Sequence, residues 1–242
     1  MTQAPSDRSR HAPLVVKIGG SLLASGGRLA SVVAILARAR RPLVIVPGGG
    51  AFADQVRDAQ AMLGTSDRAA HVMALHAMHQ TGLMLEDMQA RFVGVDTLAA
   101  MRRAIEINRI PIWMPLRLSA ADQTIAADWS VTSDALAARL AERLRFEAVL
   151  LIKSCTAPVG APPKELAAAG IVDPVFGDIV DRAGLAFRII GPGEERALAD
   201  ICLSAPSSAC ASAGSRRSSS RVERPRRGAR RNAGGFSVSP RH

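Results

Sequence analysis

Short runs of apolar residues alternate along this chain with longer segments in which apolar residues recur every three or four positions. The short runs have the length of buried β-strands, and the longer segments have the spacing of amphipathic helices. We predict strands at 14–16, 42–46, 92–95, 110–114, 149–152 and 185–190. We predict helices at 29–41, 51–62, 68–89, 98–108 and 134–144. Regular alternation of this kind predicts an α/β protein with a mostly parallel sheet, whose ligands bind at the carboxyl ends of the strands.

The length and composition favour a globular protein of one domain, or at most two. The chain has 242 residues, and its 48% of hydrophobic residues can form a full core. No apolar run reaches 18 residues, so we expect no membrane span. Residues 1–12 lack the apolar centre of a secretory signal and are expected to be flexible. The three cysteines, Cys155, Cys202 and Cys210, show no metal-ligand spacing, and their odd number favours a reducing, cytoplasmic location.

The net charge of +10 is concentrated at the end of the chain. Residues 205–242 hold nine arginines and one acidic residue, Glu223, whereas the other 204 residues hold 22 basic and 20 acidic residues. The Ser, Arg, Gly and Pro content of residues 205–242 predicts a disordered basic tail, which follows a domain at 13–204. A nucleic-acid partner is disfavoured, because no aromatic residue lies among the arginines of 216–231 to stack on a base. A solvated tail or an aberrant reading of a high-GC 3′ end are the alternatives.

A first candidate site follows the strand predicted at 14–16. Lys17 is followed by the Gly19-Gly20 turn and by Ser21, a candidate N-cap for the next helix. Glycines let the backbone approach a ligand, while a lysine and helix N-terminal amides stabilise negative charge. The stretch fits a phosphate site, and an ordinary strand-to-helix turn with a surface lysine is the alternative.

A second candidate site follows the strand predicted at 42–46, where three consecutive glycines, Gly48, Gly49 and Gly50, precede a helix. Because such a run costs backbone entropy, it is most easily explained by something that lies against the bare backbone. The segment also matches a loose dinucleotide fingerprint, which requires a following strand that ends in an acidic residue. Asp67 instead opens the helix predicted at 68–89, after Thr65 or Ser66 as its N-cap, so we do not expect a dinucleotide site.

A third candidate site, Asp128 to Asp134, contains Thr132 and Ser133 at the start of a predicted helix. Hydroxyls and carboxylates in this position bind phosphate oxygens, orient a lysine or hold Mg²⁺ through water. Helix capping is the commoner reason for such residues and remains the alternative. The chain has three lysines, of which Lys17 and Lys153 lie at strand ends, where a flexible charge is useful.

The order of these motifs, V-K-I-G-G-S, V-P-G-G-G and T-S-D-A-L-A-A, resembles the amino acid kinase superfamily over about residues 15–203. The resemblance implies a three-layer αβα sandwich with a mostly parallel central sheet and ATP-dependent phosphoryl transfer. It implies that Lys17 stabilises the transferring phosphoryl group and that Asp134 orients this lysine. It also implies that the glycines of the first two motifs bind phosphoryl oxygens and substrate.

Within the superfamily, the chain most resembles the kinases of aminomethylfuran-methanol phosphate, which serve the biosynthesis of methanofuran-type cofactors. The features that carry the resemblance are G-G-G-A-F-A-D at 48–54, D-x-x-A-H-x-M-A at 67–74, W-M-P at 113–115, W-x-V-T-S-D at 129–134 and V-D-P-x-F at 172–176. The resemblance implies phosphorylation of a small, phosphorylated metabolite, with this furan phosphate converted to its diphosphate.

Three departures from the superfamily pattern define a rival function. Ser130 stands where an acidic residue is expected, and Lys153-Ser154-Cys155-Thr156 replaces an Asp-rich loop. The closing Gly-Thr strand is missing near the start of 205–242. A nucleotide- or oxyanion-binding protein of the same fold without turnover is therefore the alternative to a kinase.

For a kinase, the candidate residues fall into three groups. Lys17, Lys153 and Asp134 would be catalytic, with the lysines flanking the moving phosphoryl group. ATP would bind at the first motif and at two later strand ends: Gly19, Gly20, Ser21, Lys153, Ser154, Gly191 and Gly193. The acceptor would bind between the second and third motifs: Gly48, Gly49, Gly50, Asp54, Arg68, His71, Thr132 and Ser133.

The charges of the expected substrates suggest which residues bind the acceptor and whether a metal is needed. Arg68 would bind an acceptor phosphate in a fork, and Asp54 would bind an acceptor amine. Mg²⁺ is expected with ATP, but no metal site of the protein itself is expected, because His76 and His79 have no marked third ligand. We further expect a small-molecule substrate and a homo-oligomer.

Overall fold

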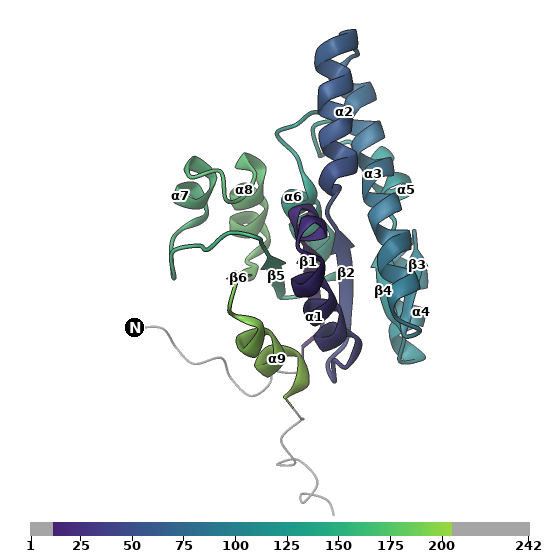
Figure 1. The fold of residues 1–242 in the computed structure, drawn as a ribbon, viewed down its shortest axis with the longest axis vertical. Helices are drawn as coiled ribbons and strands as arrows, with labels where there is room; N and C mark the ends of the chain where they lie inside the picture. Colours follow the sequence, from purple (N-terminus) through teal and green to yellow (C-terminus); the bar gives the residue numbers. More distant parts are fainter. Residues whose placement is uncertain (1–11, 205–242) are drawn as a thin grey trace, which may run out of the picture. The chain divides into compact units, whose positions relative to one another are not determined.

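The central sheet of the computed structural model contains six parallel strands in the order β3-β4-β2-β1-β5-β6 (Figure 1). The structure describes residues 12–204, so the predicted flexible start, apart from Ala12, and the predicted basic tail lie outside the described residues. The strands are β1 (Leu14–Ile18), β2 (Leu43–Pro47), β3 (Phe92–Val95), β4 (Ile110–Trp113), β5 (Ala148–Ile152) and β6 (Ala186–Ile190). Every strand pairing in this part of the chain is parallel, which confirms the predicted α/β class.

The apolar runs fold as central strands because both of their faces are covered. All five residues of β1 are buried, and Val16 lies beside Ile45 of β2 and Leu150 of β5. Alternate side chains of β1 enter two different hydrophobic clusters, with Val15 on one face and Leu14, Val16 and Ile18 on the other. Continuous apolar runs of this kind are typical of parallel strands between two helical layers.

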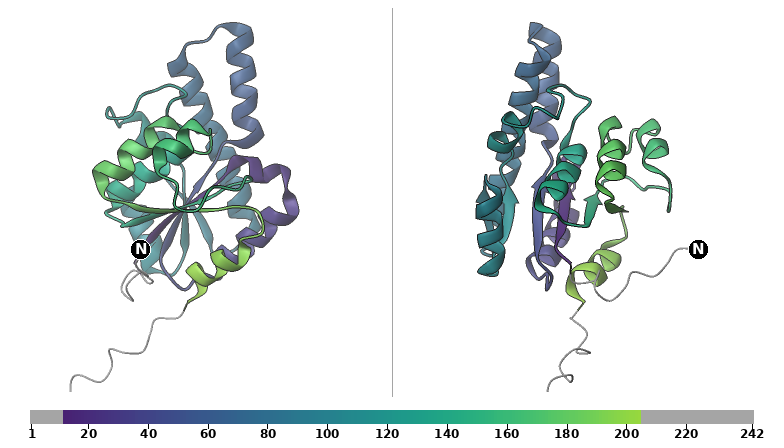
Figure 2. Two further views of the ribbon diagram at one scale, coloured as in Figure 1. Left: turned by 90° about the vertical axis from the view of Figure 1, so that its left-hand side faces the viewer. Right: turned by 180° about the vertical axis from the view of Figure 1, so that it is seen from behind.

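Helices cover both faces of the sheet and complete a three-layer αβα sandwich (Figure 2). One cluster of core residues includes α6 (Ser133–Leu144) and α8 (Pro174–Ala183), and the other includes α1 (Gly26–Ala37) and α9 (Glu195–Leu203). The remaining helices are α2 (Gly50–Leu63), α3 (Asp67–Met88), α4 (Leu98–Glu106), α5 (Leu116–Ala120) and α7 (Pro163–Ala168). The paired helices α2 and α3 extend past the carboxyl ends of the strands (Figures 1 and 2).

The structure corrects the predicted bounds of the first helix. Gly20–Ala24 forms a short 3₁₀-helix that buries Leu22. The helix α1 then runs from Gly26 to Ala37, so it begins three residues before the predicted start at Leu29 and ends four residues before the predicted end at Arg41. Ser21 is therefore not an N-cap, and its hydroxyl lies within hydrogen-bonding distance of the Ser154 hydroxyl. By contrast, Ser66 caps α3 as expected, because its Oγ accepts a hydrogen bond from the amide of Ala69.

Four helices, α5, α7, α8 and α9, were absent from the expectations. Two of them have only five or six residues, too few to show a helical period. The sequence does contain helix-start signals for α7 and α8. Pro163 and Pro174 stand in the first turns of α7 and α8, and Asp173 caps α8. No helix within residues 12–204 is long and apolar enough to cross a membrane.

Candidate functional site

Lys17, Asp134 and Lys153 form one cluster at the carboxyl ends of β1 and β5. Lys17 is next to the end of β1 and faces α6, because it alternates with residues that face α1. Its Nζ lies 2.8 Å from Oδ1 of Asp134, in the first turn of α6. Lys153, which directly follows β5, donates to Oδ2 of the same carboxylate. After β1 the chain continues to β2 on one side of the sheet, and after β5 it continues to β6 on the other side. The cluster lies between these two strand ends, at the kind of switch point where α/β proteins bind their ligands.

The cluster is nearly closed to solvent and carries excess positive charge. Lys17 is 5% exposed and Asp134 is 3% exposed. Burial would raise the pKa of Asp134, but the two ammonium groups outweigh it and hold this pKa below its usual value. Burial and the like charge of Lys17 lower the pKa of Lys153, against the pull of Asp134. Two ammonium groups on one carboxylate leave a net positive site, which suits a ligand with negative charge.

A buried carboxylate from another element, Asp173, holds the start of α6. Its Oδ2 accepts hydrogen bonds from the amide of Thr132 at 3.1 Å, the hydroxyl of Thr132 at 2.9 Å and the amide of Ala135 at 2.8 Å. Its Oδ1 accepts from the amide of Phe176 at 2.8 Å and thereby caps α8. Burial raises the pKa of Asp173, as does the nearby charge of Asp134. One side chain therefore fixes the helix turn that carries Asp134.

The glycines of the first two motifs allow two loops to pack backbone against backbone. A Cβ added to Gly20 would lie 2.1 Å from the Gly50 amide nitrogen, and one added to Gly48 would lie 2.3 Å from the Gly20 nitrogen. Gly50 also has a φ of +54°, a conformation that favours glycine. The loop at Gly19-Gly20 and the loop at Gly48 to Gly50 therefore lie against each other's bare backbone. This close packing requires glycine whether or not a ligand is bound.

Arg28 of α1 connects the segments that the sequence predicts to bind the nucleotide. Its guanidinium donates to the carbonyls of Lys153 and Gly191 and pairs with Glu195, with Nε 2.7 Å from the Glu195 carboxylate. These bonds bring the segments after β5 and β6 together. The structure thus places Ser21, Ser154, Lys153 and Gly191 at one edge of the sheet.

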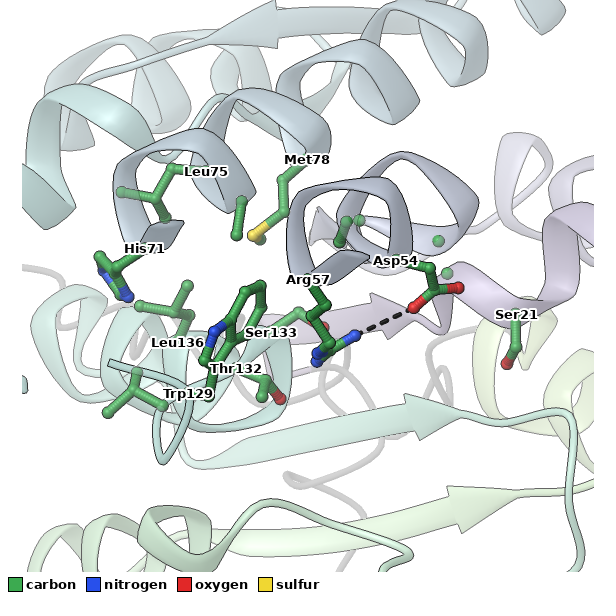
Figure 3. Close-up of a pocket in the computed structure, with 16 residues that line it drawn as sticks. Ser21, Asp54, Arg57, His71, Leu75, Met78, Trp129, Thr132, Ser133 and Leu136 are labelled. Atoms are coloured by element: carbon green, nitrogen blue, oxygen red, sulfur yellow. Dashed lines mark hydrogen bonds and ion pairs between the residues drawn. The ribbon is translucent and has the colours of Figure 1, made fainter. Parts of the chain in front are cut away.

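A cavity of about 220 Å³ lies between α2, α3 and the start of α6 (Figure 3). Polar groups from the glycine loops and α6 line it together with an apolar wall. Its lining includes Gly20, Ser21, Gly49, Gly50, Asp54, Arg57, His71, Leu75, Met78, Trp129, Thr132, Ser133 and Leu136. Because Ser133 precedes Asp134 and Gly20 lies three residues after Lys17, the cavity borders the lysine cluster.

Most of the predicted acceptor residues meet at this cavity, but Gly48 and Arg68 do not. Asp54, His71, Thr132 and Ser133 line it, whereas Arg68 is exposed in the first turn of α3 and is outside the lining. The hydroxyl of Thr132 donates its hydrogen to Asp173, so it can only accept a hydrogen bond from a ligand. The rings of His76 and His79 lie 6.0 Å apart, and residues 12–204 hold no group of three side chains suited to a metal ion.

Sequence reasoning overlooked Arg57, although the helical period points to it. Asp54 and Arg57 follow Gly50 by four and seven residues and so share the face of α2 that the glycine loop begins. The guanidinium of Arg57 lies 4.2 Å from the ring centroid of Trp129, and its NH1 lies 2.9 Å from Asp54 Oδ1. Trp129 is fixed in turn, because its Nε1 donates to Gln60 Oε1 at 2.6 Å.

Comparisons with known proteins give a matching family model and a curated relative. The family model described as the Amino acid kinase family matches residues 12–156, which is more than half of the chain. A curated relative, the (5-(aminomethyl)furan-3-yl)methyl phosphate kinase of Methanocaldococcus jannaschii, is 30% identical over 138 residues, or 57% of this chain. The match spans 63% of that protein, which is less than two thirds of its length.

Solved structures share the fold at low sequence identity. The uridylate kinase of Archaeoglobus fulgidus has a TM-score of 0.58 and 14% identity, over 78% of this chain and 95% of that one. The UMP kinase of Ureaplasma parvum has a TM-score of 0.58 and 15% identity, over 78% and 94%. At these identities the likeness concerns the fold alone.

Proposed function

Because the chain belongs to the amino acid kinase family, we propose that it transfers the γ-phosphoryl group of ATP to a small phosphorylated metabolite. The observation that carries this proposal is the buried cluster of Lys17, Asp134 and Lys153 beside a small cavity lined by both polar and apolar groups. The proposed acceptor is (5-(aminomethyl)furan-3-yl)methyl phosphate, hereafter the aminomethylfuran phosphate, on which the curated relative acts by name.

Phosphoryl transfer asks this site for position and charge rather than for covalent chemistry. In the proposed reaction an oxygen of the acceptor phosphate attacks the γ-phosphorus, and the bond from this phosphorus to the β-bridging oxygen breaks. The products are the diphosphate ester and ADP. An ionised phosphate is already a nucleophile, so no residue is needed to remove a proton. Lys17 and Lys153 would offset the charge that spreads over the moving group, and Asp134 would hold both ammonium groups in place.

The proposed ATP site lies on the β5–β6 side of the cluster. Lys153, Ser154 and Ser21 would face the phosphates, beside the loop that begins at Gly191. The amide of Gly191 already donates to Glu194 at 2.6 Å, so this loop would serve through its shape rather than through that amide. We propose Mg²⁺ as the companion of ATP. It would be held mainly by phosphate oxygens, since residues 12–204 contain no group of three or more His, Cys, Asp or Glu side chains that could hold a metal ion.

A single-turnover assay with γ-labelled ATP and the aminomethylfuran phosphate tests the proposal. We expect label in the diphosphate ester, and kcat/KM values far lower for UMP, acetylglutamate, aspartate and isopentenyl phosphate. Faster turnover of one of these would overturn the acceptor while leaving a kinase. If ATP binds but no acceptor receives label, the rival applies: a nucleotide- or oxyanion-binding protein without turnover. The replacement of an Asp-rich loop by Lys153-Ser154-Cys155-Thr156 is the observation that favours this rival.

We also propose that the chain forms a homo-oligomer. The support is a set of large apolar side chains that α2 and α3 leave exposed: Phe52, Met62, Leu63, Val72, Met73, Leu83, Met84 and Met88. Such surfaces commonly mark protein–protein contacts. Analytical ultracentrifugation would measure the assembly, and a monomer at all concentrations would contradict it.

A further inference from the structure

We propose that Arg57 binds the phosphate group of the acceptor, that Trp129 holds the guanidinium in place, and that Asp54 binds the acceptor's amine. The inference rests on the proposed function for the identity of the acceptor. Arg57 is the one lysine or arginine among the described residues that line the cavity. In Figure 3 its side chain reaches from α2 toward Thr132 and Ser133, between Asp54 and the indole of Trp129.

The stacking contact leaves the donors of Arg57 available. A guanidinium has five N–H donors along its edges, and stacking on a ring uses only its face. One nitrogen, NH1, is paired with Asp54, so the remaining donors can bind two oxygens of one phosphate group in a fork. The indole cannot swing away freely, because Gln60 accepts a hydrogen bond from Trp129 Nε1.

Asp54, Arg57 and Gln60 form one functional stripe on α2. They are spaced by three residues, so they lie on the same side of the helix. In the free protein the Asp54 carboxylate pairs with Arg57. A carboxylate has about four lone-pair sites, so Asp54 can keep this pair and also accept hydrogen bonds from an ammonium group. A ligand with both charges would therefore add two ion pairs, one with Arg57 and one with Asp54.

The rest of the cavity fits the same ligand chemistry. The amino ends of α2 at Gly50 and of α6 at Ser133 both line it and add positive potential for an anion. Leu75, Met78 and Leu136 supply an apolar wall for a ring. With about 220 Å³, the cavity is smaller than the roughly 300–1,000 Å³ of ordinary ligand sites, which favours an acceptor more compact than a nucleotide.

Calorimetric titration without nucleotide tests the inference apart from catalysis. The probes are the aminomethylfuran phosphate and the corresponding alcohol, which lacks only the phosphate. We expect the wild-type chain to prefer the phosphate ester, and Arg57→Ala to weaken its binding about 10- to 100-fold, the range for hydrogen bonds to charged groups. Arg57→Ala should bind the alcohol as the wild type does. The control is Arg102→Ala, an exposed arginine of α4 outside the cavity lining, which should change neither titration.

Two further variants separate the roles within the stripe. Trp129→Leu removes the stacking surface and should weaken binding of the phosphate ester, whereas Trp129→Phe keeps a ring and should restore most of it. Asp54→Asn should weaken binding of the aminomethylfuran phosphate more than that of the same ester without its amine. Circular dichroism of each variant checks the fold, and no loss is expected because these side chains are outside the core.

The inference is overturned if Arg57→Ala binds the phosphate ester as tightly as the wild type. It is also overturned if the wild type shows no preference for the ester over the alcohol, or if Arg68→Ala rather than Arg57→Ala removes the preference. A wild type that binds the ester through Arg57 but never phosphorylates it would leave this inference standing and would contradict the proposed function instead.

Discussion

At the scale of single residues, Lys17 is the sharpest test of the lysine cluster. Lys17→Ala should lower turnover on the order of 10²-fold or more, as the loss of a preorganised charge does. The fold should survive, because Asp134 keeps Lys153 as its partner and no buried charge is left unpaired. Turnover and thermal unfolding of Lys17→Ala are compared with those of Lys164→Ala, an exposed lysine of α7. Near-full activity of Lys17→Ala would remove this lysine from the mechanism.

Residues also show where sequence reasoning succeeds and where it stops. Lys17 and Lys153 could be predicted, because each follows a strand and parallel strands end at one edge. For Asp134 the residues leave several roles open, of which orienting a lysine is one, and the family resemblance singles out Lys17 as its partner. The glycine runs are unusual in sequence, but only the structure shows that Gly20 and Gly50 pack against each other's bare backbone. The helical period from Gly50 points to Arg57, but only the structure shows that Arg57 lines the cavity and that Arg68 does not.

At the scale of elements, Asp173 links two helices to the site. We predict that Asp173→Ala lowers both stability and turnover, because four hydrogen bonds to the starts of α6 and α8 are lost. The loss of an N-cap alone costs about 0.5–2 kcal/mol. Asp173→Asn keeps an acceptor oxygen and should restore stability more than Ala does. The measurements are urea unfolding and kcat. If turnover falls in neither variant, the position of Asp134 does not depend on this cap.

A second link between elements, the ion pair of Asp122 with Arg139, should make the free energy of unfolding depend on pH in acid. Asp122 pairs with Arg139 of α6 at 2.7 Å, and Glu142 of α6 pairs with Arg182 of α8. Burial would raise the pKa of Asp122, but the bonds from Arg139 and Thr124 outweigh it and lower this pKa to about 2. A lowered folded-state pKa gives stability that is present above the ordinary value of about 3.8 and is lost as pH falls toward 2. Unfolding free energies of the wild type and Asp122→Asn should therefore converge across this window. A constant difference down to pH 2 would contradict the assignment.

At the scale of the whole chain, the alternation of strands and helices predicted the sheet, whereas its edges were harder to foresee. The central strands β1, β2 and β5 are continuous apolar runs, so burial on both faces can be read from sequence. The strand β6 is an edge within the described residues and alternates between exposed and half-buried positions before Ile190. Short helices such as α5 and α7 carry too few residues for a period, so tertiary contacts decide them.

The last prediction concerns the basic segment after the described domain. A chain that ends at Ser204 should keep its fold and its phosphoryl transfer, because both core clusters and the lysine cluster lie within residues 12–204. Removing residues 205–242 takes away +8 of the net charge of +10, so retention on heparin and any salt-dependent binding to nucleic acid should fall sharply. Turnover, thermal unfolding and DNA titrations at two salt concentrations compare the truncated chain with the full chain. A loss of turnover or of solubility on truncation would show instead that residues 205–242 support the domain.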